Sequence, residues 1–340
     1  MNPTRMFVEA ADSARVVGAQ LPLNAPVLRE LGMRLRSEPP RAVVTCARGS
    51  SDHAATYAKY LIESHTHVLT SSAAPSVSSI YESRADLEGV LFIAISQSGK
   101  SPDLLAATQN ARSSGALTVA LCNTPGSPLM ELVEVAVPLH AGPETSVAAT
   151  KSYIASLACI AQLVANWTED RRLLAVLPQV PELLARAWSR DWSKAVEILR
   201  EAVNLFVVAR GYGLGIAQEA ALKLKETCGL HAEAFSSAEV KHGPMALVRE
   251  GFPVLMFTQR DDTRAGIEDL ASEFAARGAQ VLLAGAQAKG AISLPTVEAH
   301  PVIEPLLTIQ SFYAMANALA LARGLDPDRP PHLDKVTETV

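Results

Sequence analysis

Two stretches of the chain repeat one another at a fixed distance, and this repeat constrains the fold more than any other feature. "VVTCARGSSDHA" begins at Val43 and "LFVVARGYGLGI" begins at Leu205; each is an apolar run, then Ala-Arg-Gly, then a helix-like stretch. Gly49 and Gly211 lie 162 positions apart, and a later pair of apolar runs ends at Gln97 and at Gln259, with the same offset. A fixed offset over several elements indicates a tandem duplication.

Each copy alternates short β-rich apolar runs with longer amphipathic stretches. This alternation predicts βαβ units, and therefore an α/β fold with two parallel sheets, each flanked by helices in a flavodoxin-like three-layer sandwich. The expected parts are a helical arm over 1–35, a first domain with a linker helix over 36–190, a second domain over 191–324 and an irregular tail over 325–340.

Composition excludes several classes of function. The 340 residues are 49% hydrophobic and 19% charged, with a net charge of -5, so a nucleic-acid-binding surface is not expected. We expect no membrane-spanning segment and no signal peptide, because we find neither a run of about 18 uncharged apolar residues nor an apolar leader. Four cysteines without a C-x-x-C pair (Cys46, Cys122, Cys159 and Cys228) indicate reduced thiols in a cytoplasmic protein, and no metal or redox cofactor is implied.

One loop resembles a nucleotide-binding P-loop without completing its pattern. "AISQSGKS" has glycine, lysine and serine in the expected places, but Ala94 stands where the first glycine should be. The strand-like runs of the chain do not supply the terminal aspartate that helps hold Mg²⁺ in that class. The alternatives that remain are a plain strand-helix turn and a site for a non-nucleotide phosphate.

A phosphate site is the favoured interpretation. The loop follows an apolar strand and precedes a helix, whose first N–H groups and positive dipole end attract anions. Four side chains add hydrogen-bond donors there, and they are the predicted phosphate ligands: Ser96, Gln97, Ser98 and Ser101.

A second candidate cluster lies in "GIAQEAALKLKET". Glu219, Lys223 and Glu226 are spaced by four and three, so they share one face of a helix. A solvated face of ion pairs is the simple interpretation. A carboxylate in a partly dry pocket can instead act as a general base.

Five motifs together resemble a known family. "RGSSDHA", "ISQSGKSPD", "VAATKSY", "LKLKETCGLHAEAFSSAEVKHGP" and "HLDKVTETV" are similar to the double sugar-isomerase (SIS) domain. That domain is the isomerase part of glutamine:fructose-6-phosphate amidotransferase. The start Met1-Asn2-Pro3 lacks the N-terminal cysteine of that family's glutaminase domain, and no glutaminase-sized region precedes the repeat. The resemblance is therefore closest to stand-alone type II glucosamine-6-phosphate deaminases.

The resemblance implies catalytic roles. Glu226 matches the isomerisation base, and Lys223 matches a lysine beside it. His242 matches a residue that opens the sugar ring and that the neighbouring subunit supplies, which implies a homodimer. Lys335 matches a tail lysine that enters the site and can form a Schiff base. Without the resemblance, His242 and Lys335 would be interpreted as packed or solvated side chains.

Two further residues, Ser51 and Val147, match the lining of the family's sugar pocket. The expected function is isomerising deamination of glucosamine 6-phosphate to fructose 6-phosphate and ammonia. Alternatives are a fructosamine-phosphate deglycase, another phosphosugar isomerase, or a synthase-like aminotransferase without a glutaminase. A sugar-phosphate-sensing regulator is the non-enzymatic alternative. A nucleic acid and a membrane are not expected as partners.

Overall fold

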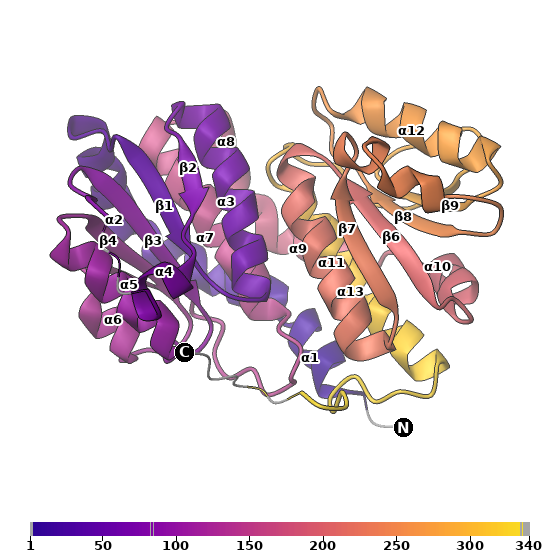
Figure 1. The fold of residues 1–340 in the computed structure, drawn as a ribbon, viewed down its shortest axis with the longest axis horizontal. Helices are drawn as coiled ribbons and strands as arrows, with labels where there is room; N and C mark the ends of the chain where they lie inside the picture. The colour runs from indigo at the N-terminus through magenta and orange to yellow at the C-terminus, as the bar shows by residue number, and fades with distance from the viewer. Residues whose placement is uncertain (1–2, 82, 84, 334, 336–340) are drawn as a thin grey trace. The chain divides into compact units, whose positions relative to one another are not determined.

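The computed structural model describes residues 3–81, 83, 85–333 and 335, and the chain divides into two compact units (Figure 1). The first unit comprises residues 15–144, 152–178 and 334–340 and contains the first sheet. The second unit comprises residues 1–14, 145–151 and 179–333 and contains the second sheet. The loop 145–151 therefore belongs to the second unit although first-unit segments flank it in sequence.

The first sheet has five parallel strands in the order β2-β1-β3-β4-β5. These strands are β1 (Ala42–Cys46), β2 (Thr70–Ser72), β3 (Val90–Ser96), β4 (Leu117–Cys122) and β5 (Val135–Pro138). The helices in this part of the chain are α2 (Ser13–Ser37), α3 (Ser50–Thr66), α4 (Pro75–Ser79), α5 (Pro102–Ser113), α6 (Pro128–Leu132), α7 (Lys151–Thr168) and α8 (Arg171–Val176).

The second sheet repeats this order from the other end, as β10-β9-β8-β6-β7. Its strands are β6 (Asn204–Ala209), β7 (His231–Ser236), β8 (Pro253–Phe257), β9 (Gln280–Ala284) and β10 (Ile292–Leu294). The helices of the second unit are α1 (Arg5–Ala11), α9 (Val180–Trp188), α10 (Ser193–Leu199), α11 (Leu214–Cys228), α12 (Arg264–Ala276) and α13 (Glu304–Ala322). The second unit also contains the 3₁₀ turns η2 (Gly211–Gly213), η3 (Glu239–Lys241) and η4 (Pro244–Leu247), and η1 (Leu177–Gln179) joins the two units.

The prediction of two parallel sheets from a duplicated sequence is confirmed. All residues of β3 and β8 are buried, as expected for strands covered by helices on both faces, and this explains why their sequences are continuously apolar. The two sheets have the same order because β1, β2 and β3 correspond to β6, β7 and β8.

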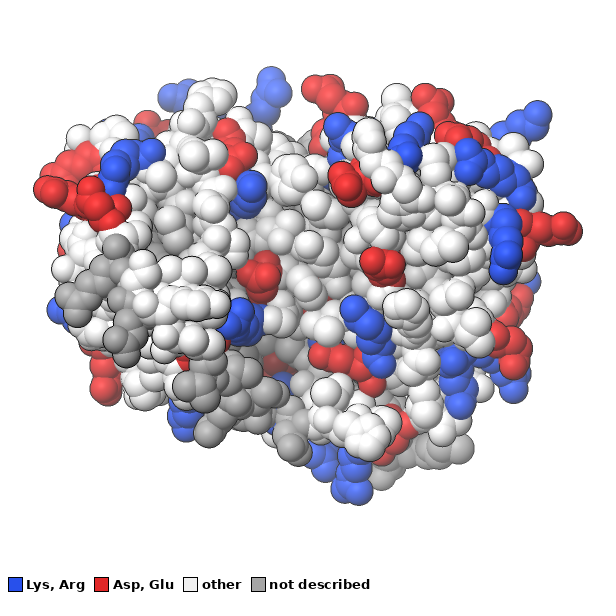
Figure 2. All heavy atoms as spheres, viewed as in Figure 1, with Lys and Arg blue, Asp and Glu red and all other residues white. Residues whose placement is uncertain are grey.

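Charged side chains of both signs are interspersed on the face of the molecule that Figure 2 shows. Several surface arginines contact a carboxylate, for example Arg260 Nη1 to Glu298 Oε2 at 2.6 Å and Arg277 Nη2 to Glu273 Oε1 at 2.7 Å. Pairing of this kind does not build the single-sign field that attracts a polyanion.

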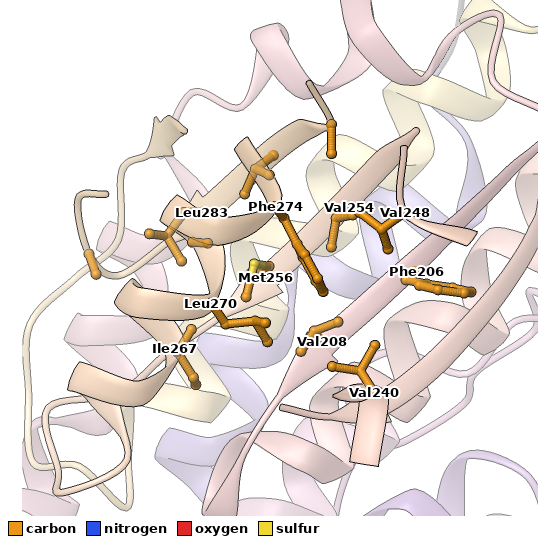
Figure 3. Close-up of a cluster of buried hydrophobic side chains, with 14 residues drawn as sticks. Phe206, Val208, Val240, Val248, Val254, Met256, Ile267, Leu270, Phe274 and Leu283 are labelled. Atoms are coloured by element: carbon orange, nitrogen blue, oxygen red, sulfur yellow. The ribbon is translucent and has the colours of Figure 1, made fainter. Parts of the chain in front are cut away.

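The second unit has a core rich in large side chains between α12 and its sheet. Phe274, Leu270 and Ile267 of α12 point toward Val208 and Met256 on the strands (Figure 3). The matching cluster in the first unit contains mainly smaller residues, among them Ala94, Ala107, Ala111 and Ala120.

Helix α13 corrects one expectation from the sequence. By length and composition α13 could cross a membrane, with a mean hydropathy of 1.2. The expectation that the chain has no run of about 18 uncharged apolar residues is therefore wrong. Of the most apolar stretch of this helix, 78% is buried inside the protein. Gln310 on this helix donates a hydrogen bond from Nε2 to the Ala10 carbonyl of α1, at 2.9 Å. The apolar character of α13 is that of a core helix.

Candidate active site

Two loops meet at the carboxyl edge of the first sheet. Strands β1 and β3 are paired, with Cys46 opposite Ala94, so the loop after β1 and the loop after β3 leave the same edge side by side. In an open α/β sheet this point, where the strand order reverses, is where ligands bind. Ser51, in the first turn of α3, and the serine-rich loop over 97–101 lie here.

The serine-rich loop is held in shape by its own side chains and by the residues beneath it. Ser96 Oγ accepts a hydrogen bond from the Gly99 N–H at 2.9 Å, and Ser98 Oγ accepts a longer one from the Lys100 N–H at 3.4 Å. Gly99 has φ of +66°, and a Cβ atom there would lie 2.3 Å from Ser127 Oγ and 2.8 Å from Cys122 Sγ. Only glycine fits this position.

Cys122 keeps the floor of the loop uncharged. Burial raises the pKa of its thiol, so the group stays protonated at neutral pH. A thiolate in this place would repel an anion bound above the loop. The protonated sulfur instead contacts Ser127 Oγ at 3.4 Å.

The end of the loop presents the start of α5. Ser101 is the N-cap residue, but its side chain makes no capping hydrogen bond, and Pro102 occupies the first helical turn. Ser96 is buried, whereas Ser51, Gln97, Ser98 and Ser101 are half-buried. The structure therefore gathers all five of these predicted ligands at one end of the first sheet, where β1 and β3 end. Their contact with a ligand remains a prediction.

The sequence interpretation missed an ion pair that joins these two loops. Arg48, which follows β1, contacts Asp103 Oδ2 through Nη2 at 2.7 Å and through Nε at 2.8 Å. The Asp103 side chain is fully buried, in the first turn of α5, and the Arg48 side chain is half-exposed. The repeated Ala-Arg-Gly triplet was the available signal for Arg48, but nothing in the sequence pattern indicated its partner.

A buried ionic cluster lies on α11 in the second unit. Lys223 Nζ contacts Glu226 Oε2 closely and Glu219 Oε1 at 3.5 Å, and the Tyr313 hydroxyl donates to Glu219 Oε1 at 3.2 Å. The side chains of Glu219 and Lys223 are 0% and 1% exposed, whereas that of Glu226 is 20% exposed. The three residues do share one face, but this face is not solvated. Glu226 is the member of the cluster that solvent and a ligand can reach.

His242 and Val147 also belong to the second unit. His242 follows the turn η3 and is exposed, with Gly243 at φ of +135° directly after it. Val147 is half-buried in the loop 145–151. The carboxylate of Glu9, in α1, holds this loop: it accepts hydrogen bonds from the N–H of Thr145 at 2.6 Å and of Ser146 at 3.1 Å. Sequence reasoning gave no signal for Glu9.

Lys335 contacts a buried acid in the first unit. Its Nζ lies 3.5 Å from Glu144 Oε2, and the Glu144 side chain is fully buried. Ser152 donates to the same carboxylate through its N–H at 3.2 Å and its Oγ at 2.6 Å. Of the tail after Leu333, only Lys335 is among the described residues. The predicted set is therefore divided: six residues are in the first unit, and Val147, Lys223, Glu226 and His242 are in the second.

Cavities in the second unit lie at the opposite end of its sheet. One cavity of about 600 Å³ is lined by Asn204, Pro253 and Gln280, which begin β6, β8 and β9. Ligands of open α/β sheets bind at the carboxyl ends, so strand geometry favours the loops over this cavity. Among the residues that the structure describes, we find no cluster of three or more His, Cys, Asp or Glu side chains suited to a metal ion.

Comparison with known proteins identifies the family. A family model described as "SIS domain" matches residues 38–166 and 198–322. Glutamine--fructose-6-phosphate aminotransferase (isomerizing) from Chlorobaculum tepidum is 32% identical over 318 residues, covering 88% of this chain and 51% of that protein. The chain thus spans about half the length of the curated relatives that it matches.

Two solved structures agree with this assignment. A "putative phosphosugar isomerase" from Silicibacter pomeroyi DSS-3 is 44% identical, covers 96% of this chain and 100% of that one, and has a TM-score of 0.92. The C-terminal domain of glucosamine-fructose-6-phosphate aminotransferase from Francisella tularensis is 25% identical, with a TM-score of 0.87 and coverage of 97% and 99%. The chain belongs to the SIS domain family and carries two copies of the domain in tandem.

Proposed function

We propose that this chain is an isomerising deaminase of glucosamine 6-phosphate, which it converts to fructose 6-phosphate and ammonia. The observation that carries the proposal is the α11 cluster, in which a buried lysine fixes one partly exposed carboxylate, Glu226. The names of the relatives support the substrate class, because they include a "putative phosphosugar isomerase" and isomerizing aminotransferases of fructose 6-phosphate.

The chemistry requires one base that serves two carbons. In the open-chain amino sugar, Glu226 takes the proton from carbon 2 as the carbon 1 oxygen gains a proton, which gives an enolamine. Glu226 then returns a proton to carbon 1 as the nitrogen loses one. The product is a ketimine at carbon 2, and addition of water releases ammonia and leaves the ketone. A single carboxylate fits both transfers because the two carbons are adjacent. Lys223 restricts the orientation of this carboxylate and also contacts the buried carboxylate of Glu219.

The remaining predicted residues have supporting roles in this proposal. Ser51 and the serine-rich loop bind the sugar and its phosphate, and Val147 lines the sugar pocket. His242 opens the ring from a second copy of the chain, a role for which its exposed position is suitable. Lys335 closes the site and is oriented by Glu144. Four buried, free cysteines are consistent with the proposed cytoplasmic location.

The test is a turnover assay on the purified chain. We expect stoichiometric ammonia and fructose 6-phosphate from glucosamine 6-phosphate. The resemblance at 44% identity to the "putative phosphosugar isomerase" favours aldose-ketose isomerisation as a second candidate, and it predicts ketose formation from sugar phosphates that have no amino group. A fructosamine phosphate in the same panel tests deglycase activity. Absence of ammonia from glucosamine 6-phosphate would contradict the proposed reaction.

The homodimer has a separate test. Glu226→Gln and His242→Ala are expected to be inactive alone. If each site takes Glu226 from one copy and His242 from the other, a hybrid dimer has one intact site. Random mixing after dissociation should then restore about a quarter of the wild-type activity. An active His242→Ala variant, or no recovery on mixing, would argue against a shared site.

A further inference from the structure

A buried negative charge lies directly after the serine-rich loop, and Arg48 is paired with it. Asp103 lies in the first turn of α5, the helix whose N-terminus faces the proposed phosphate, and its carboxylate is fully buried. A buried carboxylate so close to an anion site repels the anion strongly, because the interior screens charge poorly. Oδ1 of Asp103 also accepts a hydrogen bond from the Leu104 N–H at 2.8 Å and so occupies one of the helix donors.

We infer that Arg48 is a positioning residue that makes this loop competent for phosphate by neutralising the buried carboxylate of Asp103. Two N–H groups of its guanidinium contact the same oxygen, Oδ2. This places the positive charge on the side of the carboxylate that faces the loop after β1. The inference rests on the phosphate site of the proposed function, but not on the reaction or on the sugar.

The second copy of the domain provides a natural comparison. Arg210 occupies the position of Arg48 in the repeat, and alanine, Ala265, occupies the position of Asp103. The ion pair is therefore absent from the repeat, while the exposed arginine is present. Arg210→Ala removes the same side chain from a loop in which it has no such partner, and it is the matched control.

The experiment measures inorganic phosphate binding by calorimetry, which does not depend on turnover. Arg48→Ala should weaken binding at least about tenfold, because the buried carboxylate then loses the positive charge of its arginine partner. The double variant Arg48→Ala/Asp103→Asn should recover to within about threefold of wild type, although the ion pair is still absent. Asp103→Asn alone should bind phosphate as well as wild type or more tightly. Arg210→Ala should change binding by less than about twofold.

Each alternative gives a different result. If Arg48 is only a structural clamp, Asp103→Asn weakens binding as Arg48→Ala does. If Arg48 contacts the phosphate directly, the double variant does not recover. Either result overturns the inference, and so does a wild-type chain that binds no phosphate, whatever sugar it turns over. If Arg48→Ala does not fold, Asp103→Asn and Arg48→Lys still decide the matter, because Arg48→Lys keeps the charge and should retain most of the affinity.

Discussion

The loops that follow β1 and β6, at corresponding positions of the two copies, share a backbone turn but differ in the side chains around it. Gly49 and Gly211 both have positive φ, at 54° and 60°, so the backbone makes the same turn twice. A Cβ on Gly49 would meet nothing within 4 Å, whereas one on Gly211 would lie 3.4 Å from Gln259 Nε2 and 3.9 Å from Asp261 Oδ2. The space that is open in the first copy is filled by side chains in the second.

Gln259 lies at the centre of the side chains that fill this space in the second copy. Its Nε2 donates to the Arg210 carbonyl at 3.0 Å and lies 2.9 Å from both Asp261 Oδ2 and Thr263 Oγ1. Its counterpart Gln97 is half-buried, and the backbone carbonyl of Gln97 accepts a hydrogen bond from Thr124 Oγ1 at 3.1 Å. The two copies thus differ: the space beside the first glycine is open in one loop and filled by side chains in the other. In our proposal the second copy contributes its helix α11 instead.

The largest expected effect tests this division between the copies. Glu226→Gln keeps size and hydrogen bonding but cannot carry a proton, so turnover should fall by roughly 10²–10⁴ while binding of glucosamine 6-phosphate is nearly unchanged. Steady-state kinetics and calorimetry measure the two quantities separately. Lys225→Gln, at an exposed position of the same helix, is the control and should retain activity. A fully active Glu226→Gln enzyme would show that the second copy does not supply the base.

A pair of glycine variants tests whether the first loop needs its shape. Gly99→Ala combines a left-handed backbone with steric overlap at Ser127 and Cys122, so it should lower the free energy of unfolding by about 2–4 kcal/mol and weaken phosphate binding. Gly49→Ala has the backbone strain without the steric overlap, so it should lower the free energy of unfolding by only about 1–2 kcal/mol. Denaturant unfolding of both variants gives the comparison. Equal losses would mean that the packing beneath Gly99 relaxes freely.

The smallest expected effect concerns the two glutamines. Gln97→Ala should weaken phosphate binding by about 1 kcal/mol and leave stability nearly unchanged, because its side chain is predicted to serve the ligand. Gln259→Ala should do the reverse: it should lower the free energy of unfolding by about 1–3 kcal/mol, because the part-buried groups that Gln259 contacts lose their hydrogen bonds. Calorimetry and thermal unfolding measure the two quantities. Loss of phosphate binding in Gln259→Ala would contradict the interpretation that the second loop only packs on itself and takes no part in binding.

Periodicity and repetition were sufficient to predict the architecture. The 162-residue offset predicted two equivalent domains, and apolar runs without alternation predicted parallel strands covered on both faces. The spacing of Glu219, Lys223 and Glu226 predicted a shared helix face. These features are local or repeated, so the sequence displays them directly.

The sequence does not display which side chains become buried together. Lys223 and Glu219 have the composition of a solvated face, and only the packing of α13 with Tyr313 against α11 makes them a buried pair. The Arg48–Asp103 pair joins positions 55 apart, and the contact of Glu9 with Thr145 joins positions 136 apart. α13 was misjudged for the same reason, since its apolar surface is matched to a core that the sequence alone does not show.

The attachment of α1 to α13 has a consequence for how the chain folds. Gln310 reaches Ala10 across 300 positions, and Thr4 reaches Asn317 across 313. Helix α1 is therefore synthesised well before its partner on α13, with 300 positions between the two contacting residues. The second unit cannot close until α13 has been synthesised, while most of the first unit can already assemble. Such distant contacts are slow to form, so the loop 145–151, which Glu9 holds, should be among the last parts of the protein to become ordered.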